Sequence, residues 1–220
     1  MEDSGFVATA RGLWKDERVE IVATILLSAA VVLSAWAAYQ ATRWSGEQAN
    51  NYAQSAALRA SSGRHGTAAS RQIQIDVATF IAWVQAKEQG QTSLAAILRT
   101  RFRAEFVAPF NAWLASGPAD ASGVPPGTPF DQPSYVLAEQ TAADAILVQA
   151  DAALAEAQRD NQISDNFVLT AVLFASVLFF AGTAAKFRPQ WLRWTMMAVA
   201  CFIFAIGLVV EFILPQNVGF

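Results

Sequence analysis

Residues 21–41 read IVATILLSAAVVLSAWAAYQA, a run of 21 positions without a charged side chain. At ~1.5 Å rise per residue, a helix of this length crosses the ~30 Å hydrocarbon layer of a bilayer. We therefore predict a first transmembrane helix over residues 19–41. A cleaved signal peptide is the competing interpretation, but its apolar region would have ~7 to 15 residues. Here the apolar run is longer, and a polar helix is expected to continue directly after it.

Two further apolar runs follow near the end of the chain. Residues 166–185 carry no charge, and residues 194–214 carry only Glu211. They predict a second span over 166–186 and a third over 192–214, joined by a short turn at 187–191, where Pro189 cannot continue the incoming helix. A composition of 54% hydrophobic and 15% charged residues fits a chain that lies partly in lipid.

The distribution of Lys and Arg predicts the orientation of these spans, because cationic residues near span ends are retained on the cytoplasmic side. The cations near the N-terminal end of span one and around the 187–191 turn outnumber those near the opposite span ends: Arg11, Lys15, Arg18, Lys186, Arg188 and Arg193 against Arg43, Arg59 and Arg159. We predict that residues 1–18 and the turn are cytoplasmic, and that residues 42–165 and the tail 215–220 are extracytoplasmic.

Residues 42–165 show helical spacing of apolar positions and no strand alternation. We predict helices over about 42–61, 67–89 and 93–108, with a turn at Ser62–Gly66 and a bend or end at Pro109. A Pro-rich loop, Gly117–Pro133, is best interpreted as a plain connector. The last helix begins after it and runs into span two, with seam positions whose small members permit close approach of another helix: Val136, Ala143, Leu147, Ala150, Leu154 and Ala157. The fold class is thus an all-α membrane protein, with three transmembrane helices and an extracytoplasmic up-down four-helix bundle between the first and second.

Signatures of catalysis or of cofactor binding are not found in the sequence. The one histidine, His65, falls in the predicted turn, and the one cysteine, Cys201, falls in span three. We therefore predict no metal site, no cofactor and no enzymatic activity. The formal net charge of -3 argues against a nucleic-acid partner. Arg99, Arg101 and Arg103 could hold an anion or lipid headgroups, but a solvated charged face is the favoured interpretation.

Two residue sets near span one are candidate sites. The first is a polar clasp at the outer interface, formed by Arg43, Glu47, Asp165 and Glu211, in which Arg43 would bridge to Glu211 or Asp165 and which could line a small ion or ligand site. Interfacial snorkelling without a specific role is an equally favoured interpretation. The second set is a helix-packing face with a small residue at every fourth position, namely Ala30, Ser34, Ala38 and Thr42. Its partner could be in the same chain or in a neighbouring copy.

Several stretches resemble a family of uncharacterised bacterial three-span inner-membrane proteins. They are YQATRWSGEQA at 39–49, RFRAEF at 101–106, NQISD at 161–165 and VLFASVLFFAG at 172–182. The resemblance covers nearly the whole chain and implies a bacterial inner-membrane location. It implies no activity and no catalytic residue.

Two functional hypotheses remain open at this point. The first is a non-enzymatic docking, scaffolding or sensing protein that acts through its extracytoplasmic bundle. The alternative is a subunit of a homo-oligomeric channel or transporter, assembled through the small-residue face. Partners expected in either case are the lipid bilayer and a second copy or another membrane protein.

Overall fold

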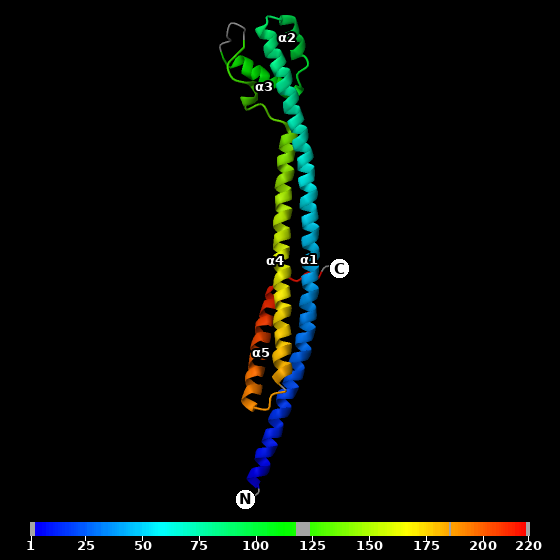
Figure 1. The fold of residues 1–220 in the computed structure, drawn as a ribbon, viewed down its shortest axis with the longest axis vertical. Helices are drawn as coiled ribbons and strands as arrows, with labels where there is room; N and C mark the ends of the chain where they lie inside the picture. The colour runs from blue at the N-terminus through cyan, green and yellow to red at the C-terminus, as the bar shows by residue number, and fades with distance from the viewer. Residues whose placement is uncertain (1–2, 118–123, 185, 219–220) are drawn as a thin grey trace. The chain divides into compact units, whose positions relative to one another are not determined.

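The computed structural model describes residues 3–117, 124–184 and 186–218, with side chains from residue 20 onward. Within these ranges the chain is helical and contains no strand (Figure 1). The elements are α1 (Asp3–Glu88), α2 (Thr92–Arg99), α3 (Ala104–Ala115), the 3-10 helix η1 (Pro129–Asp131), α4 (Ala138–Ala184) and α5 (Gln190–Ile213). The chain divides into two compact units, unit 1 with residues 1–52 and 154–220 and unit 2 with residues 53–153.

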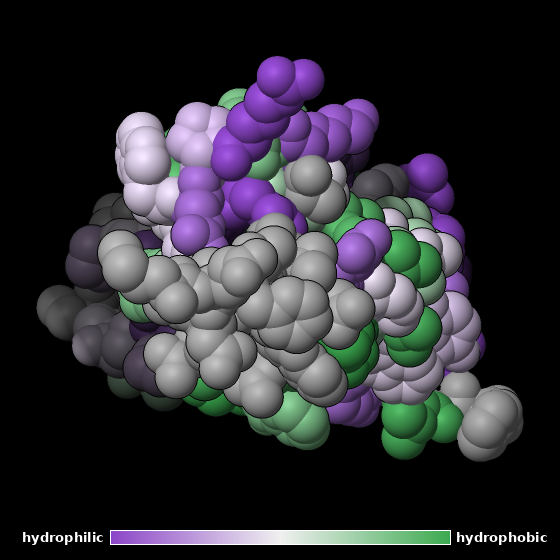
Figure 2. Space-filling view, turned by 90° about the horizontal axis from the view of Figure 1, so that it is seen from below, coloured by the Kyte–Doolittle hydropathy of each residue, from purple (hydrophilic) through white to green (hydrophobic). Residues whose placement is uncertain are grey.

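Three helices are long and apolar enough to cross a membrane, as the sequence predicted. In unit 1 they contribute one common core, formed by Ala23, Leu26 and Ala30 of α1, Phe174, Val177, Ala181 and Ala184 of α4, and Met197 and Ala200 of α5. Larger apolar side chains point away from this core, among them Ile25, Phe179 and Phe202 at 64%, 64% and 68% exposure. Figure 2, which views the molecule from below relative to Figure 1, shows hydrophobic residues on the visible surface beside hydrophilic ones. Such side chains are compatible with lipid contact.

A glycine brings α4 and α5 into close contact in unit 1. A Cβ atom added to Gly207 would lie 2.9 Å from Cε1 of Phe174. The Phe174 ring is fully buried, so its edge occupies the space that a side chain at position 207 would need.

Helices α1 and α4 pack against each other through small side chains. In unit 1 the Ser164 hydroxyl donates to the carbonyl of Ala41 at 2.9 Å. In unit 2 the Ser55 hydroxyl donates to the carbonyl of Ala150, and the Ser62 hydroxyl to that of Ala143, each at 2.8 Å. A hydroxyl on one helix can reach a backbone carbonyl of the next only when bulky side chains do not separate them. We call these small-residue layers the α1–α4 seam.

The seam confirms only part of the predicted pattern on α4. Its alanines, Ala143, Ala150 and Ala157, are 4%, 0% and 0% exposed. Of the larger residues assigned to the same seam, Leu147 is 39% exposed and Leu154 is half-buried, while Val136 precedes α4 and is 60% exposed. Close helix approach leaves room for alanine and serine and turns the larger side chains outward.

The predicted turn at Ser62–Gly66 is wrong. Helix α1 runs without interruption from Asp3 to Glu88, so the predicted helices 42–61 and 67–89 are one helix. Neither Gly63 nor Gly66 has a positive φ, and Ser62 is a member of the seam. The predicted up-down bundle of four helices is replaced in unit 2 by segments of α1 and α4 together with the short helices α2 and α3. The prediction that the last helix continues into span two is confirmed by α4.

The segment that follows α1 turns sharply at Gly90, which has a φ of 70°. The amide of Gln91 donates to the Ala86 carbonyl at 2.8 Å, and the amide of Gly90 to the Lys87 carbonyl at 3.0 Å. This pair of bonds is a Schellman motif, in which glycine is favoured because of the left-handed conformation. The helix predicted over 93–108 is divided at residues 100–103 into α2 and α3, and Pro109 lies inside α3 without ending it.

Unit 2 is held together by an aromatic core. It contains Phe80 and Trp83 of α1, Phe102, and Phe106, Phe110 and Trp113 of α3. Edge-to-face contacts dominate, such as those of Trp83 with Phe110 (4.9 Å between ring centroids) and Phe80 with Trp113 (5.2 Å). Rings in this geometry stabilise a core beyond their area of burial.

The described part of the Pro-rich loop packs on this aromatic core. Val124 and Phe130 lie against it, and the Trp113 indole nitrogen donates to the Pro126 carbonyl at 3.1 Å. Residues 124–133 are therefore part of the fold of unit 2 and not a plain connector. Residues 118–123 of the predicted loop lie outside the described residues.

Candidate functional site

The contacts described for the predicted polar clasp lead to residues outside it. Asp165 accepts a hydrogen bond from Asn161 at 3.1 Å, and Arg43 donates to the Asn217 side chain at 3.3 Å. Glu211 is 4% exposed, and neither of its carboxylate oxygens has a hydrogen-bond partner among the described residues. Glu47 is partly exposed.

The polar contacts at this level of unit 1 come instead from the tail after α5. The buried Gln40 side chain donates to Oε1 of Gln216 at 2.8 Å and accepts from the backbone amide of Asn217 at 3.0 Å. The Trp36 indole donates to the same Gln216 oxygen at 3.0 Å, and the Trp44 indole donates to the Pro215 carbonyl at 3.0 Å. Sequence reasoning missed this contact because a tail of a few residues shows no periodicity. The side chains of Trp36, Gln40 and Trp44 near the end of span one were the signal that could have indicated this contact, because indole and amide groups need hydrogen-bond partners.

The predicted small-residue face is only partly buried within the chain itself. Ala30 is fully buried and belongs to the common core of the spans, and Ser34 is half-buried. Ala38 and Thr42 are exposed, and the Thr42 hydroxyl donates to the Ala38 carbonyl at 3.0 Å within α1. The buried positions lie one residue earlier, at Ala37 instead of Ala38 and at Ala41 instead of Thr42. Ala37 follows the buried Ala30 by seven residues, which is the spacing of a contact between two packed helices.

In unit 2 a buried carboxylate anchors the aromatic core. Asp76 is fully buried, accepts from Nε of Arg103 at 3.2 Å and accepts from the Tyr135 hydroxyl at 3.1 Å. Arg103 also pairs with Glu105. Burial raises the pKa of the Asp76 carboxyl above its ordinary value of 3.8, although Arg103 and Tyr135 oppose that shift. Burial, together with the neighbouring Asp76, raises the pKa of Tyr135 to about 12. The network joins α1, the start of α3 and the segment before α4.

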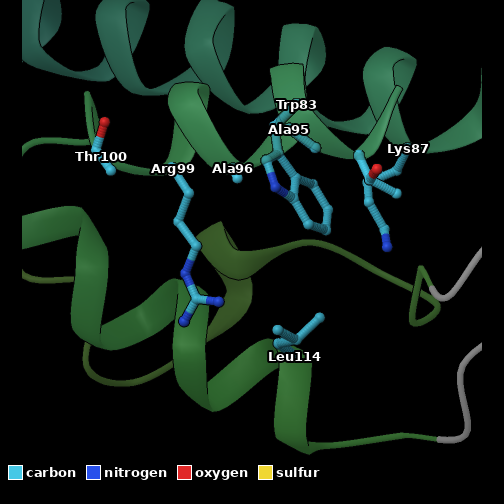
Figure 3. Close-up of a pocket in the computed structure, with 8 residues that line it drawn as sticks. Trp83, Lys87, Ala95, Ala96, Arg99, Thr100 and Leu114 are labelled. Atoms are coloured by element: carbon cyan, nitrogen blue, oxygen red, sulfur yellow. The ribbon is translucent and has the colours of Figure 1, made fainter. Parts of the chain in front are cut away.

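An open groove of about 600 Å³ lies beside this core, also in unit 2. Figure 3 shows Trp83 and Lys87 of α1, Arg99 of α2 and Leu114 of α3 around it. The remaining lining residues are small, namely Thr92, Ala95, Ala96 and Thr100. Trp83 is 5% exposed and belongs mainly to the aromatic core, and Arg99 and Lys87 lie on either side of it. We call this feature the Trp83 groove.

Two cationic side chains line the Trp83 groove, and no carboxylate is among the described lining residues. The Arg99 guanidinium donates to the Asn111 amide oxygen at 2.7 Å and lies 5.6 Å from the centre of the Phe110 ring. Both partners are electrically neutral, so they orient the guanidinium without compensating its charge. Of the three arginines considered from sequence, Arg99 lines the groove, Arg103 is part of the Asp76 network, and Arg101 is exposed.

His65 lies on α1 and not in a turn. Its Nδ1 is 2.6 Å from a carboxylate oxygen of Glu139 on α4. In the part of the chain that the structure describes, no three His, Cys, Asp or Glu side chains converge as metal ligands would.

Comparisons with known proteins give no relative from which a function could be transferred. No family model matches the chain, and neither a curated protein nor a solved structure matches it. Functional inference therefore depends on the residues themselves.

Proposed function

We propose that this is a bacterial inner-membrane protein without catalytic activity that docks or senses a partner through unit 2. In this proposal the N-terminus and the turn between α4 and α5 are cytoplasmic, and residues 42–165 are extracytoplasmic. The orientation is supported by the distribution of Lys and Arg near the span ends. The bacterial inner-membrane assignment is supported by the resemblance described above.

The observation that carries the proposal is the surface of unit 2. Its described helices expose large apolar side chains that its own aromatic core does not use: Ile73, Ile75, Ile81, Leu94, Ile97, Val107, Leu147 and Val148. Interaction surfaces are built from exposed apolar side chains of this kind, where several of them are contiguous. The Trp83 groove lies within the same unit.

Removal of residues 67–133 tests the proposal, because it deletes the aromatic core and the groove together. His65 and Glu139 are in contact, so Gly66 and Ser134 can be joined while the seam layers at Ser55 and Ser62 are retained. We expect the shortened protein to reach the membrane. In cells treated with formaldehyde, it should no longer be cross-linked to the partner proteins that the full chain captures. The measurement is quantitative mass spectrometry of adducts at equal expression. Adducts and growth phenotypes that are the same for both forms would defeat the docking proposal.

The alternative, a subunit of a homo-oligomeric channel or transporter, is favoured by one observation. Glu211 is a buried carboxylate near the end of α5 whose oxygens have no hydrogen-bond partner among the described residues. Intramembrane carboxylates frequently mark ion pathways. Liposomes containing the purified protein are expected to show no potassium or proton flux under the docking proposal. A flux that the substitution Glu211→Gln abolishes would support the channel instead.

A further inference from the structure

We propose that Glu211 is a proton-binding site in unit 1, and that the described part of the tail after α5, residues 215–218, closes it. In this arrangement the carboxyl group holds a proton out of contact with water and exchanges it when the tail moves aside. The inference goes beyond the proposed docking function, because it concerns a titratable group in unit 1. It requires binding of a proton at one site and no conduction across the membrane.

Glu211 is buried without a group that would stabilise its charge. It is 4% exposed, and neither carboxylate oxygen has a hydrogen-bond partner among the described residues. Nor does it form an ion pair with any of them. The surroundings at this end of α5 are largely apolar, since Leu214 packs on a cluster that contains Ala41 of α1 and Phe167 of α4. An unpaired carboxylate is disfavoured in such surroundings, and the group takes up a proton instead.

The charged groups of the elements that surround Glu211 have other contacts. On α1, Arg43 donates to the Asn217 side chain at 3.3 Å, and the titratable Tyr39 is 47% exposed. On α4, Asp165 is the last charged residue, and it accepts a hydrogen bond within the same helix. The described part of the tail carries no charged side chain. Among the described residues, therefore, no cation is paired with Glu211.

The oxygen atoms around the tail favour a proton over a metal ion. A hard cation takes about six oxygen ligands. Here Oε1 of Gln216 accepts from both Gln40 and Trp36, which occupies both of its lone pairs. The Gln40 oxygen in turn accepts from the backbone amide of Asn217. A proton needs only one oxygen of the Glu211 carboxyl group, so it fits this site without further ligands.

The packing of α4 on α5 closes the site on the side away from the tail. Gly207 lies four residues before Glu211 and therefore on the same face of α5. A Cβ atom added to Gly207 would lie 2.9 Å from Cε1 of Phe174, whose ring is fully buried. The ring thus fills this face one turn before Glu211. Protons consequently reach the carboxyl group from the side of the tail and not from the turn between α4 and α5.

The tail closes the remaining side and can open without unfolding a helix. It follows the end of α5 at Ile213, and its residues 215–218 are not helical. Nε2 of Gln216 donates to the Glu211 backbone carbonyl at 2.9 Å, which holds the tail over the last turn of α5. Gln40, which donates to the same Gln216 side chain, is fully buried. Movement of the tail breaks these side-chain hydrogen bonds and exposes Glu211 to water.

Infrared spectroscopy of the full protein in phosphatidylcholine nanodiscs tests whether Glu211 holds a proton. Spectra of the native protein and of Glu211→Gln are compared at neutral pH, in buffers that contain sodium, potassium or choline chloride. We expect the native spectrum to contain an additional carboxylic-acid absorption that does not depend on the salt. An additional carboxylate absorption in its place, or an acid absorption that sodium or potassium removes, would overturn the proposal.

Labelling with a water-soluble carbodiimide and an amine tests closure by the tail while Glu211 itself is retained. Mass spectrometry compares the rate of amide formation at Glu211 with the rate at the exposed Asp144. We expect Glu211 in the native protein to react at least roughly tenfold more slowly than Asp144. Gln216→Ala, which removes the hydrogen bonds to Gln40 and to the Glu211 carbonyl, should raise the rate at Glu211 roughly tenfold. Val218→Ala, a change at an exposed position of the same tail, should leave it unchanged.

Three results would contradict a closed site. Equal reactivity of Glu211 and Asp144 in the native protein would show that the carboxyl group is open to water. An equal effect of Gln216→Ala and Val218→Ala would show that the tail does not control access. A proton flux across liposomes that contain the native protein would contradict closure on the other side. The docking proposal is tested separately, because deletion of residues 67–133 leaves Glu211 and the tail in place.

Discussion

The glycines of α1 show how tertiary contacts override local turn preference. A Ser-Gly-Arg-His-Gly stretch is a reasonable turn signal, yet Gly63 and Gly66 are helical and have open space where a Cβ would be. Gly90, by contrast, has a φ of 70° and ends the helix. The same residue type therefore has opposite roles only 24 positions apart.

These roles predict opposite effects of the same substitution. Gly63→Ala and Gly66→Ala should each raise the free energy of unfolding by about 0.5–1 kcal/mol, because alanine costs less entropy in a helix interior. Gly90→Ala should lower it by about 1–2 kcal/mol, because a Cβ is disfavoured in the left-handed conformation. Guanidinium unfolding in detergent micelles, followed by circular dichroism, measures each change. If both glycines in the 62–66 stretch behave like Gly90, then α1 is broken there.

The buried Asp76 predicts a pH dependence at the same scale. Its pKa is higher in the folded state than the ordinary value of 3.8, chiefly because of burial. The folded state therefore binds the proton more tightly, and its contribution to stability is full below the unfolded pKa and is lost as the pH rises toward the folded pKa.

We expect the stability of the native protein, relative to Asp76→Asn, to fall as the pH is raised from about 4 and then to level off. The other carboxylates titrate in both proteins, so the difference between their unfolding midpoints at each pH isolates Asp76. A difference that rises with pH would show that Arg103 and Tyr135 outweigh burial.

At the scale of elements, the sequence predicts the helices well where apolar and charged residues are separated into long runs along the chain. The three uncharged runs identify the spanning parts of α1, α4 and α5, and the unbroken pattern after Ser134 predicts that α4 enters span two. The division between α2 and α3 was not predicted, because Pro109 is the stronger local signal but is tolerated inside α3. The break at residues 100–103 instead follows the packing of Phe102 and Phe106 in the aromatic core.

The seam predicts which alanines on α4 cannot be enlarged. Ala150 is fully buried and its carbonyl accepts from Ser55, whereas Ala152 is exposed. Ala150→Leu should lower the free energy of unfolding by about 1–3 kcal/mol, since a larger side chain separates the two helices. Ala152→Leu, the same change on the outer face, should have an effect within about 0.5 kcal/mol. Equal tolerance at both positions, measured by thermal melting, would contradict close packing of α1 and α4.

At the scale of the whole molecule, the candidate sites were harder to predict than the helices. The members of the predicted polar clasp at the end of span one were chosen by charge. The contacts found there are made mainly by amides and indoles, such as Gln40 with Gln216. The Trp83 groove could not be predicted, because it arises where the end of α1 meets α2 and α3, and the division between α2 and α3 was not predicted.

The proposed orientation can be measured on intact cells with single cysteines. With Cys201 replaced by serine, Ala112→Cys in α3 should react with a membrane-impermeant maleimide without permeabilisation. Gln190→Cys, at the start of α5, should react only after permeabilisation. Both positions are exposed, so access to water outside or inside the cell decides the result. The opposite labelling pattern would place unit 2 in the cytosol.

The repetition within the α1–α4 seam has a consequence for how the two helices are kept from sliding. Within unit 2, Ser55 and Ser62 on α1 and Ala143 and Ala150 on α4 are each seven residues apart, so an axial slip by one heptad would again oppose small side chains. The contacts that do not repeat must then fix the alignment. In unit 2 these are Arg59 with Asp151 and His65 with Glu139. Polar pairs that add little to stability would thus determine which of several near-equivalent alignments the chain adopts.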